Sequence, residues 1–181
     1  HLFRFIFVLF TILLVLLPVI FCKPRINAGR TNVTSTSDAF YDINVKTLHP
    51  VSSVTSELDG TPISLSESSS HKYIAKLTEN GSMTITARSF NGQIATRTYK
   101  VSHLDTEKPE LLKSYSQSGL VYLEVLDAYS GINYDKITGL TPESYDTSTG
   151  TIAFKIPAAP TTVTIPDNAG NELTLLISPV N

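Results

Sequence analysis

Asp and Asn side chains are the groups in this sequence best suited to chemistry, and several of them lie in predicted turns of its C-terminal half. Asp127, Asp135 and Asp167 lie in or near loops, and Asn168 and Asn171 follow the last of them. Calcium takes several oxygen ligands, largely from such side chains. We therefore take Asp127, Asp135, Asp167 and Asn171 as candidate calcium ligands.

The same residue types have a structural use. Asp and Asn side chains accept hydrogen bonds from the backbone of their own turns. Gly131 and Gly170 stand in the same loops and supply positive φ. The pattern thus also fits turns that need no metal, and it favours this second interpretation.

Tyrosines are concentrated in the same half of the chain, at positions Tyr115, Tyr122, Tyr129, Tyr134 and Tyr145. Aromatic faces stack on sugars and on protein partners. Tyrosine is also favoured in strands, where it packs on a sheet. Because Tyr129 and Tyr134 lie near a loop, we expect this pair to be exposed and take it as a candidate binding site.

Catalytic residue patterns do not emerge from the sequence. His49, His71 and His103 lie apart, and none has metal-ligand spacing to another His or to Cys22. No nucleophile-elbow pattern surrounds a serine. The net charge of −2 offers no basic surface for nucleic acid. We expect a protein that is not an enzyme, binds no cofactor and does not bind nucleic acid.

The longest apolar stretch, Leu2–Phe21, contains a single charged residue, Arg4. About 20 helical residues cover the roughly 30 Å hydrocarbon core of a bilayer, so the sequence predicts a membrane as a partner through a transmembrane anchor. Two alternatives stay open. A cleaved signal peptide usually has a shorter apolar centre, and a lipid-modified Cys22 would follow smaller residues than Val19–Phe21.

The charges on either side of this apolar stretch and the composition of the rest of the chain predict opposite orientations in the membrane. More basic residues follow the span than precede it, which by the positive-inside rule places the rest of the chain in the cytoplasm. The chain begins at His1, and we expect part of a basic start to be missing. The Thr-, Ser- and Tyr-rich remainder is typical of extracytoplasmic proteins. We expect a cell-membrane or cell-surface location with the soluble part extracytoplasmic.

Apolar residues after the span alternate with polar ones, as Val121, Leu123 and Val125 do with Tyr122 and Glu124. Turn residues interrupt this alternation about every 8–12 residues, which is typical of many short strands. The pattern predicts an all-β fold of sandwiches.

The chain divides into four predicted parts: a membrane segment at 1–22, a linker at 23–40, one sandwich at 41–104 and a second at 105–181. The charged run before Pro109 marks the boundary between the sandwiches. Segments around Met83, Gly92 and Val101 recur after about 80 residues, which is a domain length and indicates tandem domains.

Three segments of the second half carry a family resemblance: Asp105-Thr106-Glu107-Lys108-Pro109, Leu123–Asp127 with Ser130-Gly131-Ile132, and Ile165–Asn171. They resemble bacterial immunoglobulin-like domains, which surface proteins of Gram-positive and especially clostridial bacteria carry in arrays. The first half looks like a more divergent copy, with Ser89–Gly92 where the second has Asn168–Asn171.

The resemblance implies two tandem immunoglobulin-like β-sandwiches after an N-terminal transmembrane or signal helix. It implies a non-catalytic spacer, adhesive or protein-binding module, whose partner is a cell-surface protein or a polysaccharide. The alternative is an accessory carbohydrate-binding module of a larger cell-surface enzyme, of which this chain is a truncated part.

Overall fold

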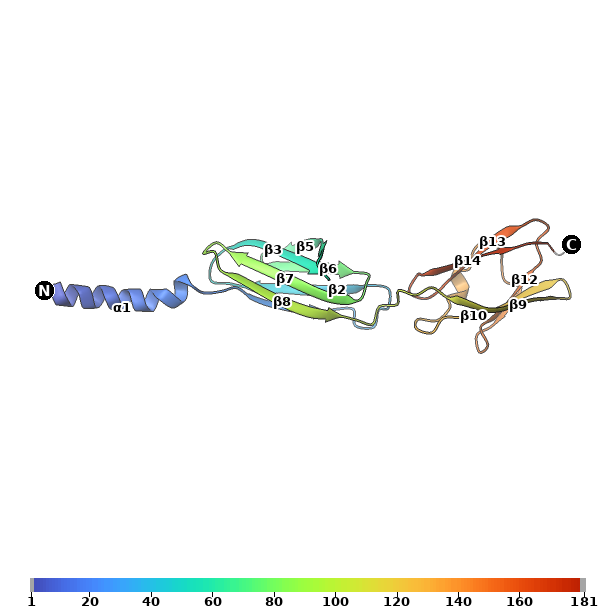
Figure 1. Ribbon diagram of the computed structural model, residues 1–181, viewed down its shortest axis with the longest axis horizontal. Coiled ribbons are helices and arrows are strands. Elements are labelled where there is room, and N and C mark those ends of the chain that lie inside the picture. The colour runs from blue at the N-terminus through green and yellow to red at the C-terminus, as the bar shows by residue number, and fades with distance from the viewer. Residues whose placement is uncertain (1, 180–181) are drawn as a thin grey trace. The chain divides into compact units, whose positions relative to one another are not determined.

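The computed structural model describes residues 2–179 as one helix followed by short strands (Figure 1). Two compact units make up the chain. Unit 1 consists of residues 1–33 and 39–102, and unit 2 consists of residues 34–38 and 103–181. The sequence placed the boundary two residues later, between 104 and 105.

Helix α1 spans Leu2–Ile20 and buries none of its residues. Its large apolar side chains are between 41% and 80% exposed, so the residues that the structure describes bury none of them. Its 19 residues are long and apolar enough to cross a membrane, and a signal sequence at the N-terminus meets the same criterion.

Unit 1 is a sandwich of two four-stranded antiparallel sheets. One sheet has the order β1-β2-β6-β5, and the other has the order β4-β3-β7-β8. The strands of the first sheet are β1 (Arg25–Arg30), β2 (Ala39–Lys46), β5 (Leu65–Ser69) and β6 (Lys72–Leu77). Those of the second are β3 (Val51–Leu58), β4 (Thr61–Ile63), β7 (Gly81–Ser89) and β8 (Ile94–Val101). Lettered in chain order, these sheets are A-B-E-D and C′-C-F-G, which is the immunoglobulin arrangement.

The core of unit 1 follows the period-two pattern of its strands. In β7, Met83, Ile85 and Ala87 are fully buried, while the threonines between them are half-buried. In β2, Ile43 and Val45 are buried in the same alternation. Successive side chains of a strand point to opposite faces, so this pattern places one face of each sheet against the other.

Unit 2 repeats the first of these sheets. Its four-stranded sheet has the order β11-β12-β10-β9, which is again A-B-E-D. The strands are β9 (Glu110–Gln117), β10 (Leu120–Leu126), β11 (Ser144–Asp146) and β12 (Thr151–Lys155). The opposite sheet consists of the antiparallel hairpin β13 (Thr161–Pro166) and β14 (Glu172–Ile177), in the F and G positions.

Position C of unit 2 has no regular strand among the described residues. Isolated bridges join Ile132 to Asp167 and Thr138 to Thr164, on either side of the 3-10 helix η1 (Tyr134–Lys136). Gly139 contributes to this irregular course, because its φ is +92° and a Cβ there would collide with the Thr162 carbonyl oxygen.

Buried apolar residues from both layers form the core of unit 2, among them Leu123, Ile152, Phe154, Val163 and Ile165. They come from β10 and β12 in the four-stranded sheet and from β13 in the opposite sheet. The predicted all-β fold of two tandem immunoglobulin-like sandwiches after an apolar N-terminal helix is confirmed.

The prediction of a linker at 23–40 is wrong where the structure forms a strand. Arg25–Arg30 forms β1, which pairs with β2 from Arg25↔Lys46 to Arg30↔Tyr41. Only Ile26 of this strand is buried, so the sequence has no apolar alternation there, and pairing with β2 decides its conformation. Residues 34–38 belong with unit 2, where the Thr36 carbonyl oxygen accepts a hydrogen bond from the Asp105 backbone N–H.

Candidate functional site

Three carboxylates come together at one end of unit 2. Asp105 precedes β9, Asp127 follows β10 and Asp167 follows β13, and one oxygen from each lies within 4.8 Å of the others. Asp105 is 6% exposed and Asp167 is 1% exposed, whereas Asp127 is half-buried. The loops of an immunoglobulin sandwich cluster at its two ends, and this clustering brings together residues that are distant in sequence.

Asp167 organises the turn between β13 and β14. Its Oδ1 accepts hydrogen bonds from the backbone N–H groups of Gly170 at 2.6 Å and Asn171 at 2.8 Å. Its Oδ2 accepts a bond from the side-chain amide of Asn171 at 2.8 Å. Gly170 has a φ of +101°, which glycine adopts without steric cost. This carboxylate therefore closes its own turn.

Asp127 organises the loop after β10 in a similar way. Its Oδ1 accepts backbone N–H bonds from Tyr129, Ser130 and Gly131, at 3.2, 2.8 and 2.6 Å. Gly131 has a φ of +80°. Backbone donors to a carboxylate are charge-assisted and compensate its negative charge where water is excluded.

Asp105 connects these two turns to the segment that leads into β9. Its Oδ1 accepts the Glu107 N–H at 3.1 Å, and its Oδ2 accepts the Ser130 N–H at 3.0 Å. The Asn171 side-chain amide donates to its backbone carbonyl at 3.2 Å. Separately, the Asn168 side-chain amide donates to the Ser130 carbonyl oxygen at 2.9 Å. Side-chain hydrogen bonds thus join three segments: the one before β9, the loop after β10 and the turn after β13.

The structure brings together Asp127, Asp167 and Asn171 from the predicted calcium set, but not Asp135. Asp135 is exposed in η1 and lies outside the carboxylate cluster. Asn171 points its amide nitrogen, a donor, at Asp167, so in this arrangement that nitrogen cannot serve as a ligand. Sequence reasoning missed Asp105, although its place at the start of the second domain was a usable signal.

Chemically, the cluster offers carboxylate oxygens of the kind that hard cations prefer. Asp105 and Asp167 accept donors on both carboxylate oxygens, and Asp127 accepts several on one. The arrangement therefore acts as a latch, in which side-chain hydrogen bonds of Asp105, Asp127, Asp167 and Asn171 hold these segments together.

The two candidate binding tyrosines differ in environment. Tyr129 is 55% exposed in the loop after β10. Tyr134 is half-buried, packs against the core of unit 2 and stacks on Tyr145, with ring centroids 4.5 Å apart. Burial raises the pKa of Tyr134, and the charges of Asp146 and Tyr145 raise this pKa further. The expectation that Tyr134 is an exposed partner of Tyr129 is wrong, because its ring is half-buried against the core and against Tyr145.

Tyr115 and Tyr122 form a second stacked pair. They are directly opposite across β9 and β10, with centroids 4.9 Å apart, and the Lys113 ammonium lies over the Tyr115 ring at 5.3 Å. These rings support the sheet as a cross-strand pair.

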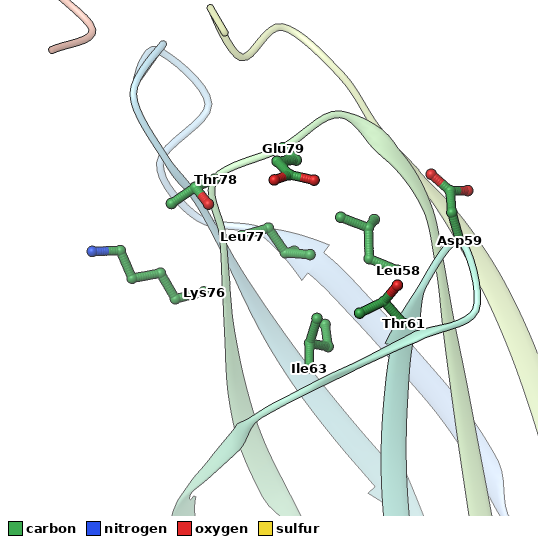
Figure 2. A pocket seen from close by; sticks show the side chains of 8 residues that line it. All are labelled: Leu58, Asp59, Thr61, Ile63, Lys76, Leu77, Thr78 and Glu79. Atoms are coloured by element: carbon green, nitrogen blue, oxygen red, sulfur yellow. The ribbon is translucent and has the colours of Figure 1, made fainter. Parts of the chain in front are cut away.

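Unit 1 has a pocket of about 300 Å³ that the sequence did not reveal (Figure 2). It lies between the turn that joins β3 to β4 and the turn that joins β6 to β7. Leu58, Ile63 and Leu77 provide apolar walls, and the carboxylates of Asp59 and Glu79 stand at its upper side in Figure 2.

Comparison with known proteins gives structural matches only. No protein family matches the sequence, and no curated protein does. Fibronectin(III)-like modules of Clostridium thermocellum CbhA match with 16% identity and a TM-score of 0.32, over 84% of this chain and 94% of theirs.

Two further structures match at lower identity. The Escherichia coli adhesin FdeC has 14% identity and a TM-score of 0.34, with 87% of this chain and 64% of that chain covered. The full ectodomain of mouse nectin-like molecule 4 has 14% identity and a TM-score of 0.28, with 87% and 63% covered. The chain thus spans less than two thirds of the length of these two proteins. The immunoglobulin-like assignment rests on the strand order of the two units.

Proposed function

We propose that this protein is a non-catalytic surface module, held to a membrane by α1, whose two sandwiches stand outside the cytoplasm as a spacer and protein-binding element. The observation that carries the proposal is that α1 exposes its apolar side chains and buries none of them. Phe3 is 80% exposed and Leu2 is 74% exposed, and no residue of the helix is buried. A contiguous apolar surface of this length needs a cover, and its length matches a bilayer core.

The two units suit a structural role at a surface. Each has its own buried core, as an independent domain does, and both contain a sheet of the order A-B-E-D. Their resemblance to Gram-positive surface domains supports a bacterial cell-surface setting. A cell-surface protein or polysaccharide is the partner class that such a module would meet.

The carbohydrate-binding alternative loses one of its two candidate residues. Tyr134 stacks on Tyr145 and packs on the core, which leaves only Tyr129 as an exposed ring in that pair. Stacking on a sugar needs a free aromatic face. We therefore do not extend the proposal to sugar binding.

Fractionation of cells that express the full chain tests the anchor. We expect the protein to remain in the membrane pellet after alkaline carbonate extraction, with an intact mass that includes α1. In the matched variant, Leu9→Arg with Leu13→Arg, two charges interrupt the span at exposed positions outside both sandwiches, and this variant should leave the pellet. Recovery of the unaltered chain in the soluble cytoplasmic fraction would contradict the proposal. Secretion of a chain that lacks α1 would replace the anchor by a signal peptide.

A further inference from the structure

We infer that the pocket between the β3–β4 and β6–β7 turns of unit 1 receives the side chain of a lysine or arginine from a partner protein. This inference rests on the protein-binding part of the proposed function and deepens it, whereas anchoring and display hold whether or not the pocket is filled. It rests on the size of the pocket, its apolar walls and the charges at its mouth.

The size of the pocket suits one side chain. Its volume of about 300 Å³ is at the lower end of the range for small-molecule sites, which begins at about 300 Å³. Leu58 and Ile63 are half-buried, and Leu77 is 2% exposed, so its walls form part of the core boundary. Lysine and arginine place their methylene stems against such apolar surface and keep the charged head at a polar rim.

The rim carries negative charge that is fixed in place. Asp59 Oδ1 accepts the Ser82 backbone N–H at 3.0 Å, and the Asp59 N–H donates to the Ser82 carbonyl oxygen at 3.1 Å. Gly81 leaves the space that the carboxylate occupies, because a Cβ there would collide with Asp59 Oδ2. The Asp59 carboxylate is therefore held in position, which lowers the entropic cost of pairing with a cation.

Glu79 supplies the second carboxylate, on the β6–β7 turn across from Asp59 (Figure 2). It is exposed and makes no hydrogen bond or ion pair with the part of the chain that the structure describes. Lys76, the one cation lining the pocket, points away from it in Figure 2 and lies over the Phe40 ring at 5.6 Å. The mouth is thus complementary to a positive charge.

Other ligand classes fit less well. An anion would meet two carboxylates at the mouth, and like charges at close range are unfavourable. A purely apolar group would contact the walls, but it would also remove water from the carboxylates at the mouth without offering them a hydrogen bond or an opposite charge. An amphipathic cation satisfies both parts of the pocket at once.

Methyl NMR of the full chain in lipid nanodiscs tests this inference, with isotope-labelled Leu and Ile methyl groups. The probes are the acetylated, amidated pentapeptides Ser-Gly-Arg-Gly-Ser and Ser-Gly-Lys-Gly-Ser, compared with Ser-Gly-Gln-Gly-Ser. We expect saturable shifts of the Leu58, Ile63 and Leu77 methyl signals with the basic peptides and at least about fivefold weaker binding of the neutral one. Binding should weaken as salt rises from about 50 to about 300 mM, because the charges are near the surface.

Variants locate the effect. Glu79→Gln should weaken binding of the arginine peptide at least about threefold without changing the fold, because Glu79 has no partner to lose within residues 2–179. Glu67→Gln, an exposed acid on β5 outside the pocket, should change nothing. The inference is overturned if these methyl signals do not shift with the basic peptides, if the neutral peptide binds equally well, or if Glu79→Gln binds like the unaltered protein. None of these outcomes changes the result expected when cells are fractionated, so the membrane anchor is tested separately.

Discussion

The side-chain amide of Asn171 donates a hydrogen bond to the backbone carbonyl oxygen of Asp105, 66 residues earlier, at 3.2 Å. This contact fastens the segment before β9 to the turn before the last strand, β14. Asn171 also bonds the Asp167 carboxylate, so one side chain joins the two buried acids of the cluster. These hydrogen bonds explain why Asp167 and Asn171, which the sequence offered as calcium ligands, stand in this turn.

Replacing Asp167 should loosen unit 2. Asp167→Ala removes a carboxylate that is 1% exposed and leaves the Gly170 and Asn171 N–H groups without their acceptor, and we expect a loss of about 1–3 kcal/mol. Hydrogen exchange of the β13 and β14 amides in the full chain measures this loss. Asp135→Asn is the matched control, because Asp135 is exposed in η1, and it should change the free energy by less than about 0.5 kcal/mol. Equal protection in both variants would show that the latch contributes nothing.

Calcium should leave the stability of unit 2 unchanged. Backbone N–H groups hold all three carboxylates in their turns, and we expect these bonds to position them without an ion. We expect melting temperatures in millimolar calcium and in chelator to agree within about 1 °C. A ligand present at 100 times its Kd would add about 2.7 kcal/mol. A rise of several degrees that Asp127→Asn abolishes would instead establish the cluster as a calcium site.

Alkaline pH should weaken unit 2 through Tyr134. Burial first, and then the charges of Asp146 and Tyr145, raise the pKa of Tyr134 above its ordinary value of 10.0. The unfolded chain therefore loses this proton before the folded chain does. The stabilisation is complete below about pH 10 and is lost as the pH rises through the folded pKa.

The difference between two variants isolates this contribution. Tyr134→Phe should show a smaller loss of stability than the unaltered protein between about pH 9 and pH 11. Tyr129→Phe, at an exposed ring, should follow the unaltered protein. Absorbance titration of tyrosine ionisation checks the pKa directly. Parallel pH profiles for all three proteins would contradict the assignment.

The sequence predicted the parts of the fold that depend on local patterns. Alternation of Met83, Ile85 and Ala87 is visible in the sequence, and the strand that contains them buries these side chains. Strand β1 was missed because its conformation comes from pairing with β2, and a strand with one buried residue has no detectable period.

The sequence predicted that Asp residues in turns form the candidate site, but not which of them come together. Asp127 and Asp167 were found because Asp before Gly indicates a turn. Asp105 was missed and Asp135 was wrongly grouped with them, since loop proximity depends on which end of the sandwich each turn occupies. The pocket beside Glu79 was not predictable, because its walls come from β3, β4 and β6.

Labelling of intact cells tests the central claim most directly, because it reports which side of the membrane the sandwiches occupy. Cys22 is the only cysteine, so a Cys22→Ser background allows one reporter at a time, Ser66→Cys in unit 1 or Thr147→Cys in unit 2, both at exposed positions. With a membrane-impermeant maleimide, the proposal predicts that both reporters label as fully before lysis as after it. Labelling of either reporter only after lysis would place that sandwich in the cytoplasm and contradict the proposed function.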